Sequence, residues 1–284
     1  MKTVSLGGGK SVPALGLGTW RMGESARSQS AEIAAMRSAL LMGYRLVDTA
    51  EMYGEGGAET VVGRAVNDAL RAGELQRDEL FIVSKVYPHN ASHDGTLAAC
   101  ERTLKRLGLD HIDLYLLNWR GSHPLRDTVA AFEALVAQGR MRHWGVSNFD
   151  SDDMEELWGI EHGANCVANQ VYYSLSERGA EFSLFPWLRR HSMAGMAYCP
   201  IDQGALAGDR TLAAIGKRHG ASAAQIALAW VLAQPGVIAI PKAVKESHLH
   251  ENLAAAELVL SAEDVVELEA RFPKPTRKQP LAMS

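Results

Sequence analysis

The chain has 284 residues, 47% of them hydrophobic, and a formal net charge of −4, which fits two average domains or one (β/α)8 barrel of about 250 residues. This charge argues against nucleic acid as a partner, since nucleic acid needs a concentrated basic surface. No apolar run approaches the roughly 20 residues of a membrane span. Because Cys100, Cys166 and Cys199 are widely spaced and the N-terminus lacks a signal-peptide pattern, we expect a cytoplasmic protein without disulfides.

Residues 1–14 have the pattern of a small β-hairpin with Gly7-Gly8-Gly9 as its turn. After it, apolar runs of strand length alternate with segments whose apolar residues recur at helical spacing. Ile33, Met36 and Leu40 are one example, and Gly43 is a natural stop after them. We predict strands at 15–18, 45–48, 80–85, 112–117, 142–146, 165–168, 195–198 and 237–240, and helices at 30–42, 58–72, 97–107, 125–138, 152–158, 179–191, 222–233, 245–255 and 261–271.

Regular alternation of apolar strands and helices predicts an α/β protein with a parallel sheet covered by helices. Eight such units favour closure into a (β/α)8 TIM barrel, and no G-x-G-x-x-G follows the first strand to suggest an open dinucleotide-binding sheet. We therefore predict a single barrel domain over residues 1–284, with the N-terminal hairpin, extra C-terminal helices and a C-terminal tail at 272–284.

Polar side chains follow three successive predicted strands, namely Asp48, Lys85 and Asn118, and Tyr53 lies on the loop after the first of these. The C-terminal ends of barrel strands meet at one mouth, so these groups are expected to converge there. A phenol has a pKa of about 10, and a nearby ammonium lowers the pKa by favouring the phenolate. Asp48 would hold Lys85 charged, and the Asn118 amide can donate to a carbonyl oxygen. The set suggests protonation of a polarised carbonyl. Taken singly, each residue is better explained as a cap, a turn former, a packed ring or a solvated lysine.

The chain resembles an aldo-keto reductase over nearly its full length. The matching motifs are L-G-L-G-T-W at 15–20, V-D-T-A-E-M-Y-G at 47–54, V-S-K at 83–85, L-Y-L-L-N-W at 114–119, G-V-S-N-F at 145–149, N-Q-V at 169–171, and I-P-K-A-V at 240–244 with E-N at 251–252. It most resembles the bacterial branch that includes methylglyoxal and diketogluconate reductases.

This resemblance implies NADPH-dependent reduction of small aldehydes or ketones, methylglyoxal-like or sugar-derived, to alcohols, with NADH as a possible alternative cofactor. It assigns Tyr53 as general acid, Lys85 as the group that tunes its pKa, Asp48 as the partner of the lysine and Asn118 as the carbonyl donor. Trp20, Tyr87 and Trp119 would wall the substrate pocket. The cofactor would contact Gly18, Thr19, Trp20, Asp48, Ser147, Asn148, Gln170, Tyr198, Pro200, Ile201, Gln203, Lys242, Ala243, His248, Glu251 and Asn252.

Two residues depart from the family pattern. Asn118 stands where the family usually has His, and Asn also occurs at this place in potassium-channel β-subunits, which are slow reductases that serve as binding modules. His248 stands where the family often has Arg, which makes NADPH preference over NADH less firm because an Arg fork is the better phosphate ligand. A weakly catalytic nicotinamide-binding sensor or interaction module is therefore the alternative reading.

Other partners are less well indicated by the sequence. His248 and His250 are two residues apart, so on a helix they point in different directions and make a poor metal pair. We predict no metal, a small-molecule carbonyl substrate, no membrane or nucleic-acid partner, and a monomer or weak homo-oligomer.

Overall fold

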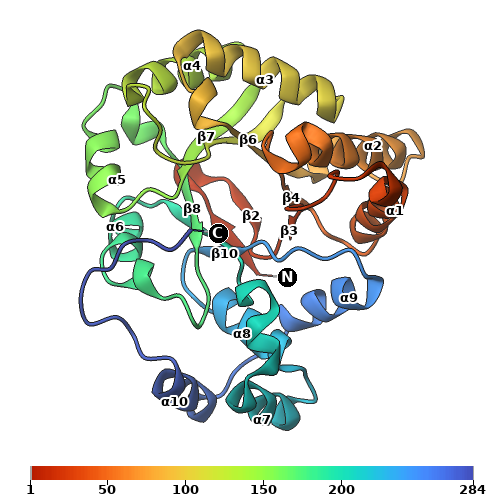
Figure 1. The fold of residues 1–284 in the computed structure, drawn as a ribbon, viewed down its shortest axis with the longest axis vertical. Coiled ribbons are helices and arrows are strands. Elements are labelled where there is room, and N and C mark those ends of the chain that lie inside the picture. Colours follow the sequence, from red (N-terminus) through yellow and green to blue (C-terminus); the bar gives the residue numbers. More distant parts are fainter. Residues whose placement is uncertain (1, 284) are drawn as a thin grey trace.

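The computed structural model describes residues 2–283 and confirms the TIM barrel. Its central sheet has eight parallel strands in the order β10-β9-β8-β7-β6-β5-β4-β3, so each strand pairs with its neighbours in the chain. These strands surround the centre of the molecule in Figure 1. They are β3 (Leu17–Gly18), β4 (Leu46–Asp48), β5 (Phe81–Val86), β6 (Ile112–Leu117), β7 (Met141–Ser147), β8 (Ala168–Tyr172), β9 (Ala194–Tyr198) and β10 (Val237–Ala239).

The barrel closes where the first strand meets the last. Leu15 bridges Ala239 and Gly18 bridges Lys242, both in parallel, and the Gly16 amide donates to the Ala239 carbonyl at 2.8 Å. A Cβ on Gly18 would lie 2.7 Å from the Ile240 carbonyl oxygen. Gly18 is therefore required at this close approach of two backbones, and closure leaves the sheet without a free edge.

Helices form a ring around the barrel and bury the outer faces of the strands (Figure 1). Every residue of β5 and β6 is buried, as expected for parallel strands that are covered on both faces. Among the described residues, no helix has the length and apolar character needed to span a bilayer. The helices are α1 (Ala26–Leu41), α2 (Gly57–Arg71), α3 (His93–Leu107), α4 (Leu125–Ala137), α5 (Ser151–Trp158), α6 (Leu184–Arg190), α7 (Arg210–His219), α8 (Ala223–Leu232), α9 (Glu246–Ala255) and α10 (Ala262–Arg271).

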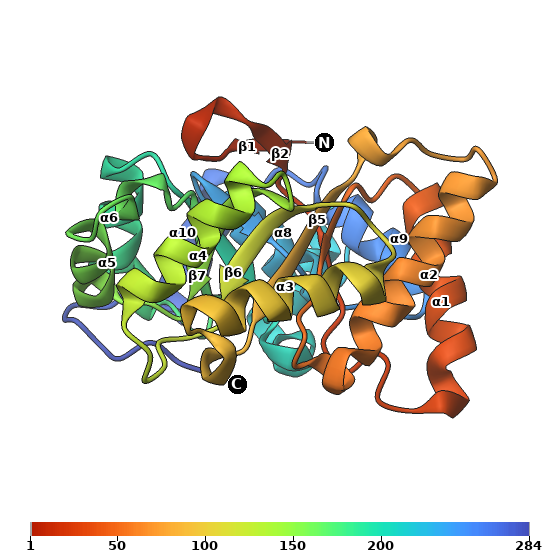
Figure 2. The same cartoon turned by 90° about the horizontal axis from the view of Figure 1, so that it is seen from above.

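The predicted N-terminal hairpin is present as β1 (Thr3–Ser5) and β2 (Ser11–Pro13), joined through a short 3-10 turn at Gly7–Gly9. Leu6 and Val12 are each 1% exposed, so the hairpin packs its apolar side onto the barrel. Figure 2 shows the hairpin at one end of the barrel and the C-terminus at the opposite end. The N-terminal end of the barrel is therefore covered, and the strand C-termini face the other way.

Five element predictions need correction. The strand predicted at 165–168 is β8 at Ala168–Tyr172, because Asn165 belongs to a 3-10 turn at Gly163–Asn165. The helix predicted at 30–42 begins at Ala26, where the Ser25 side chain caps it. The helix predicted at 179–191 is a 3-10 turn at Gly179–Glu181 followed by α6. The strand predicted at 15–18 is regular only at Leu17–Gly18. Helix α7 was not predicted, although Asp209 caps its N-terminus and Gly220 ends it.

Candidate active site

A cavity of about 360 Å³ opens at the C-terminal end of the barrel strands, where TIM barrels place their chemistry. It is lined by side chains from several strand ends and the loops after them. The predicted site residues among them are Gly18, Thr19, Trp20, Asp48, Tyr53, Asn118, Trp119, Ser147, Asn148, Gln170, Tyr198, Pro200, Ile201, Gln203 and Lys242.

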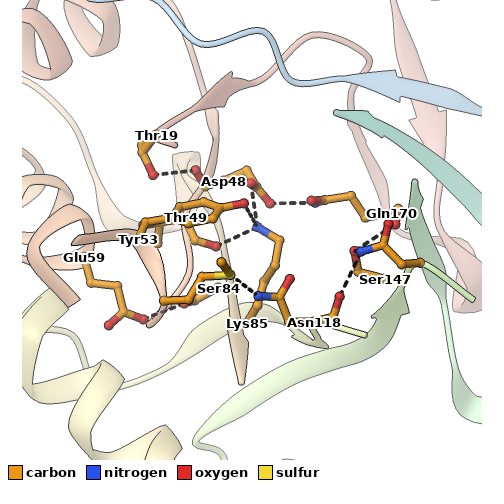
Figure 3. A network of polar contacts seen from close by, with 12 residues as sticks. Thr19, Asp48, Thr49, Tyr53, Glu59, Ser84, Lys85, Asn118, Ser147 and Gln170 are labelled. Atoms are coloured by element: carbon orange, nitrogen blue, oxygen red, sulfur yellow. Dashed lines mark hydrogen bonds and ion pairs between the residues drawn. The ribbon is translucent and has the colours of Figure 1, made fainter. Parts of the chain in front are cut away.

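The Lys85 ammonium lies at the centre of a buried polar cluster beside this cavity (Figure 3). Its Nζ donates to Asp48 Oδ2 at 2.7 Å, to the Thr49 carbonyl at 2.8 Å and to the Tyr53 hydroxyl at 3.2 Å. Lys85 and Asp48 are only 1% and 2% exposed. Parallel pairing of β4 with β5 brings the two side chains together, since Asp48 is in register with Val83. The convergence that the sequence suggested is therefore present in the structure.

Burial and the ion pair oppose each other in this cluster. Burial alone would lower the pKa of Lys85, but Asp48 and Tyr53 outweigh it, so the pKa is raised and the lysine stays charged. Burial raises the pKa of Tyr53, and Lys85 lowers it by a smaller amount. The net direction is upward, so the expectation that Lys85 brings the phenol below its ordinary pKa is wrong for the protein alone. The phenol keeps its proton at neutral pH, the form that a general acid needs.

A second group of hydrogen bonds continues from Asp48 across the barrel mouth. The side-chain Nε2 of Gln170 donates to Asp48 Oδ1 at 2.7 Å, and the Ser147 hydroxyl donates to the backbone carbonyl of Gln170 at 2.8 Å. The Tyr198 hydroxyl donates to Asn148 Oδ1 at 2.8 Å, and Asn148 takes a positive φ of 60°. These bonds fix the orientation of four strand ends around the cavity, those of β4, β7, β8 and β9.

Asn118 is 5% exposed and is held from two sides. Its Nδ2 lies 2.9 Å from the Met52 sulfur, and its backbone carbonyl accepts from Asn148 Nδ2 at 3.0 Å. The amide has two N–H donors, so one remains for a second acceptor while Met52 takes the first. Figure 3 places Asn118 beside the Lys85 cluster.

Some predicted contact residues do not line the cavity. Tyr87 lies outside it, with its ring edge-on to Trp119 at a centroid distance of 5.8 Å. Ala243 is buried, and Asn252 is half-buried on α9. His248 and Glu251, also on α9, are exposed. Their cofactor roles stay predictions.

The cavity also has lining residues that were not among the predicted contact residues, and they are Arg21, Met52, Cys199, Gly204, Ile240, Pro241 and Met283. Met52, Ile240 and Pro241 lie inside the family-like motifs, and Arg21 directly follows the motif that ends at Trp20. Met283 lies in the C-terminal tail, far along the chain from any strand end, so nothing in the sequence pattern pointed to it.

The loop after β9 borders the cavity in an unusual conformation. Cys199, Asp202 and Gln203 all have φ of 50°, a region that non-glycine residues seldom adopt. The Asp202 carboxylate holds the loop by accepting from the Tyr172 hydroxyl and, at 2.8 Å, from the Ser176 hydroxyl. Local strain that is held by specific contacts is typical of ligand-binding segments.

Comparisons with known proteins agree with this geometry. Residues 14–271 match the model of the Aldo/keto reductase family. The chain is 45% identical to methylglyoxal reductase YeaE of Escherichia coli over 99% of both chains, and 35% identical to glyoxal reductase of Bacillus subtilis over 94% of this chain and 92% of that one. An aldo-keto reductase of Klebsiella pneumoniae, solved in complex with NADPH, superposes with a TM-score of 0.94 at 45% identity, covering 100% of this chain and 99% of that one.

The fold and the site together define a barrel oxidoreductase. The chain belongs to the aldo/keto reductase family, and the resemblance drawn from its motifs is confirmed.

Among residues 2–283, no three or more His, Cys, Asp or Glu side chains gather as a metal site would require. Cys100 and Cys166 are free and buried.

Proposed function

We propose that this protein reduces small aldehydes and ketones to alcohols with NADPH, and that Tyr53 is the general acid. The observation that carries this proposal is the Tyr53 hydroxyl, which lies 3.2 Å from a buried lysine that is itself fixed by Asp48 and the Thr49 carbonyl. Such an arrangement holds the phenolic proton at a defined point at the mouth of the barrel.

The residues present fit a nicotinamide cofactor. The cavity runs from Asp48 and Tyr53 to Lys242, and the Lys242 ammonium makes no ion pair with the described residues, so it is free for an anionic group. The half-buried Tyr198 ring offers a flat face at the wall. When bound, NADPH supplies the hydride for the carbonyl carbon. The Klebsiella pneumoniae relatives were solved with NADPH and with NADP and acetate, which supports the same cofactor here.

The protein supplies the remaining chemistry. Asn118 orients the carbonyl oxygen through its amide N–H, and Tyr53 gives a proton to that oxygen as negative charge develops on it. Lys85 stays positively charged and stabilises the phenolate that remains. Asp48 keeps the ammonium in place, while Gln170 fixes the other carboxylate oxygen at 2.7 Å.

Small dicarbonyls are the proposed substrates, because the relatives from Escherichia coli and Bacillus subtilis are a methylglyoxal reductase and a glyoxal reductase. We place the protein in the cytoplasm on the same relationship. A sensor module with negligible turnover is less favoured, since the cluster of Asp48, Tyr53 and Lys85 is intact.

The test is the loss of nicotinamide absorbance when the purified protein is mixed with NADPH and methylglyoxal, with Asn118→His beside it. Turnover by the unaltered chain at a rate no lower than that of the variant is the expected result. Tight NADPH binding without turnover, restored by Asn118→His, would establish the module instead. Lys242→Met should raise KM for NADPH more than KM for NADH if Lys242 binds the additional phosphate.

A further inference from the structure

Arg21 lies on the segment between β3 and α1 and lines the cavity. Its guanidinium carbon is 4.6 Å from the centroid of the Trp20 ring, over the face of the indole. The side chain is exposed and makes no ion pair or hydrogen bond with the described residues. An arginine at a pocket mouth without a carboxylate partner has five N–H donors to offer to a ligand.

The side chains that line the cavity carry an excess of positive charge. Only Arg21, Asp48 and Lys242 carry formal charge among its lining residues. Asp48 is neutralised by Lys85 at 2.7 Å and is 2% exposed. The cavity therefore presents two free cations and no free carboxylate, which favours anionic groups.

The two cations lie on different segments of the cavity wall. Lys242 follows β10 and bridges Gly18, at the position that the proposed function gives to the cofactor. Arg21 is stacked on Trp20, which is predicted both to contact the cofactor and to wall the substrate pocket. We infer that Arg21 selects carbonyl substrates that carry a carboxylate beyond the reacting carbonyl, and that it grips this carboxylate as substrate enters; the inference rests on the proposed reductase function.

The backbone around Arg21 supports a fixed position for its guanidinium. Arg21 has a φ of 63°, a conformation that residues with a Cβ seldom adopt and that persists only where surrounding structure imposes it. A close backbone contact lies two residues after Arg21. Gly23 packs so closely on Gly57 that a Cβ on Gly23 would lie 2.1 Å from the Gly57 carbonyl carbon. This contact ties the Arg21 segment to the N-terminus of α2, next to the loop of Tyr53.

A guanidinium held by stacking suits a carboxylate for geometric reasons. Its planar fork can make two parallel charge-assisted hydrogen bonds to the two oxygens. Stacking on Trp20 removes part of the rotational freedom that such binding would otherwise have to restrict. A neutral substrate gains neither hydrogen bond. The preference is therefore measured as the ratio of kcat/KM for a charged substrate to kcat/KM for its neutral analogue.

The experiment compares 4-formylbenzoate with its methyl ester, which has the same aldehyde and ring but no charge. The ratio of their kcat/KM values is measured for the unaltered protein and for Arg21→Met, Arg21→Lys and Arg21→Glu. Intrinsic differences in aldehyde reactivity cancel when variants are compared. Arg27→Met is the control, because Arg27 lies on the exposed start of α1, its side chain makes no hydrogen bond or ion pair with the described residues, and it does not line the cavity.

We expect Arg21→Met to lower the ratio about tenfold, as loss of a hydrogen-bonded charge at an exposed site would. Arg21→Lys should retain part of the preference, Arg21→Glu should lower the ratio below that of Arg21→Met, and Arg27→Met should leave it unchanged. Added salt should lower the ratio in the unaltered protein and not in Arg21→Met. A ratio that is the same in all four proteins, with both aldehydes reduced, overturns the role of Arg21 alone. No reduction of either aldehyde by a protein that does reduce methylglyoxal also overturns the inference. No reduction of methylglyoxal or of either aldehyde overturns the proposed function.

Discussion

The buried pair of Asp48 and Lys85 should show strong energetic coupling. Lys85→Met removes the ammonium and leaves Asp48, which is 2% exposed, with Gln170 as its remaining side-chain donor. Asp48→Asn removes the negative charge beside Lys85 and leaves the ammonium with neutral acceptors, among them the Thr49 carbonyl and the Tyr53 hydroxyl. Removing one partner of a buried pair costs about 3–5 kcal/mol, because the remaining charge loses its compensation. Each single variant should therefore lose that much free energy of unfolding.

The double variant Asp48→Asn/Lys85→Met removes both charges and should be more stable than the sum of the single losses predicts. A coupling energy of about 1–3 kcal/mol is expected for two residues in contact. Urea unfolding followed in parallel by tryptophan fluorescence and circular dichroism measures it, with coincident curves as the condition for a single free energy. Strict additivity of the two single losses would refute the reasoning, since it would mean that neither charge depends on the other.

Three further predictions follow from individual contacts. Met52→Leu nearly conserves volume and should slow turnover up to about tenfold, because it releases the Asn118 amide from its 2.9 Å contact with the Met52 sulfur. Asn118→Leu should slow turnover by about 10²–10³. Equal rates in Met52→Leu and the unaltered protein would show that Met52 does not position Asn118. Gly23→Ala should cost about 1–3 kcal/mol more than Gly43→Ala, because both have positive φ but only Gly23 faces backbone at 2.1 Å, and thermal unfolding compares them. Burial would raise the pKa of Asp264, but hydrogen bonds from Arg218, His219 and Ser261 outweigh it and hold the pKa well below its ordinary value. A carboxyl whose pKa is depressed in the folded protein stabilises it at pH values above the unfolded pKa of about 3.9. Asp264→Asn should therefore have a lower free energy of unfolding than the unaltered protein at pH 7, and this difference should shrink as the pH falls below about 3.9. A difference in free energy that is constant with pH would contradict this.

The barrel was predictable because its strands and helices have strong, regular patterns. Residues 112–117, for example, form a mostly apolar run, broken only by Asp113, that is fully buried as β6. Element ends were harder to place, because short 3-10 turns carry no periodicity. Asn165 belongs to such a turn, and the predicted strand was therefore displaced toward it.

The members of the buried cluster could be predicted, but its energetics could not. Asp48 and Lys85 lie at the C-terminal ends of β4 and β5, and Tyr53 lies on the loop after β4, so topology alone brings them together. The pKa of Tyr53 depends on how deeply the ring and its neighbours are buried, and burial outweighs the lysine. The contact of Gln170 with Asp48 spans 122 positions in sequence, and the approach of Met283 to the cavity depends on the path of the tail.

The most direct test of the proposed mechanism is the rate of NADPH oxidation with methylglyoxal in Tyr53→Phe, measured beside NADPH affinity in the same samples. Phenylalanine keeps the ring and removes the hydroxyl that lies 3.2 Å from Lys85 Nζ. We predict that turnover falls by about 10²–10⁴-fold while NADPH still binds. A Tyr53→Phe variant that turns over at the rate of the unaltered protein would contradict the assignment of Tyr53 as the general acid.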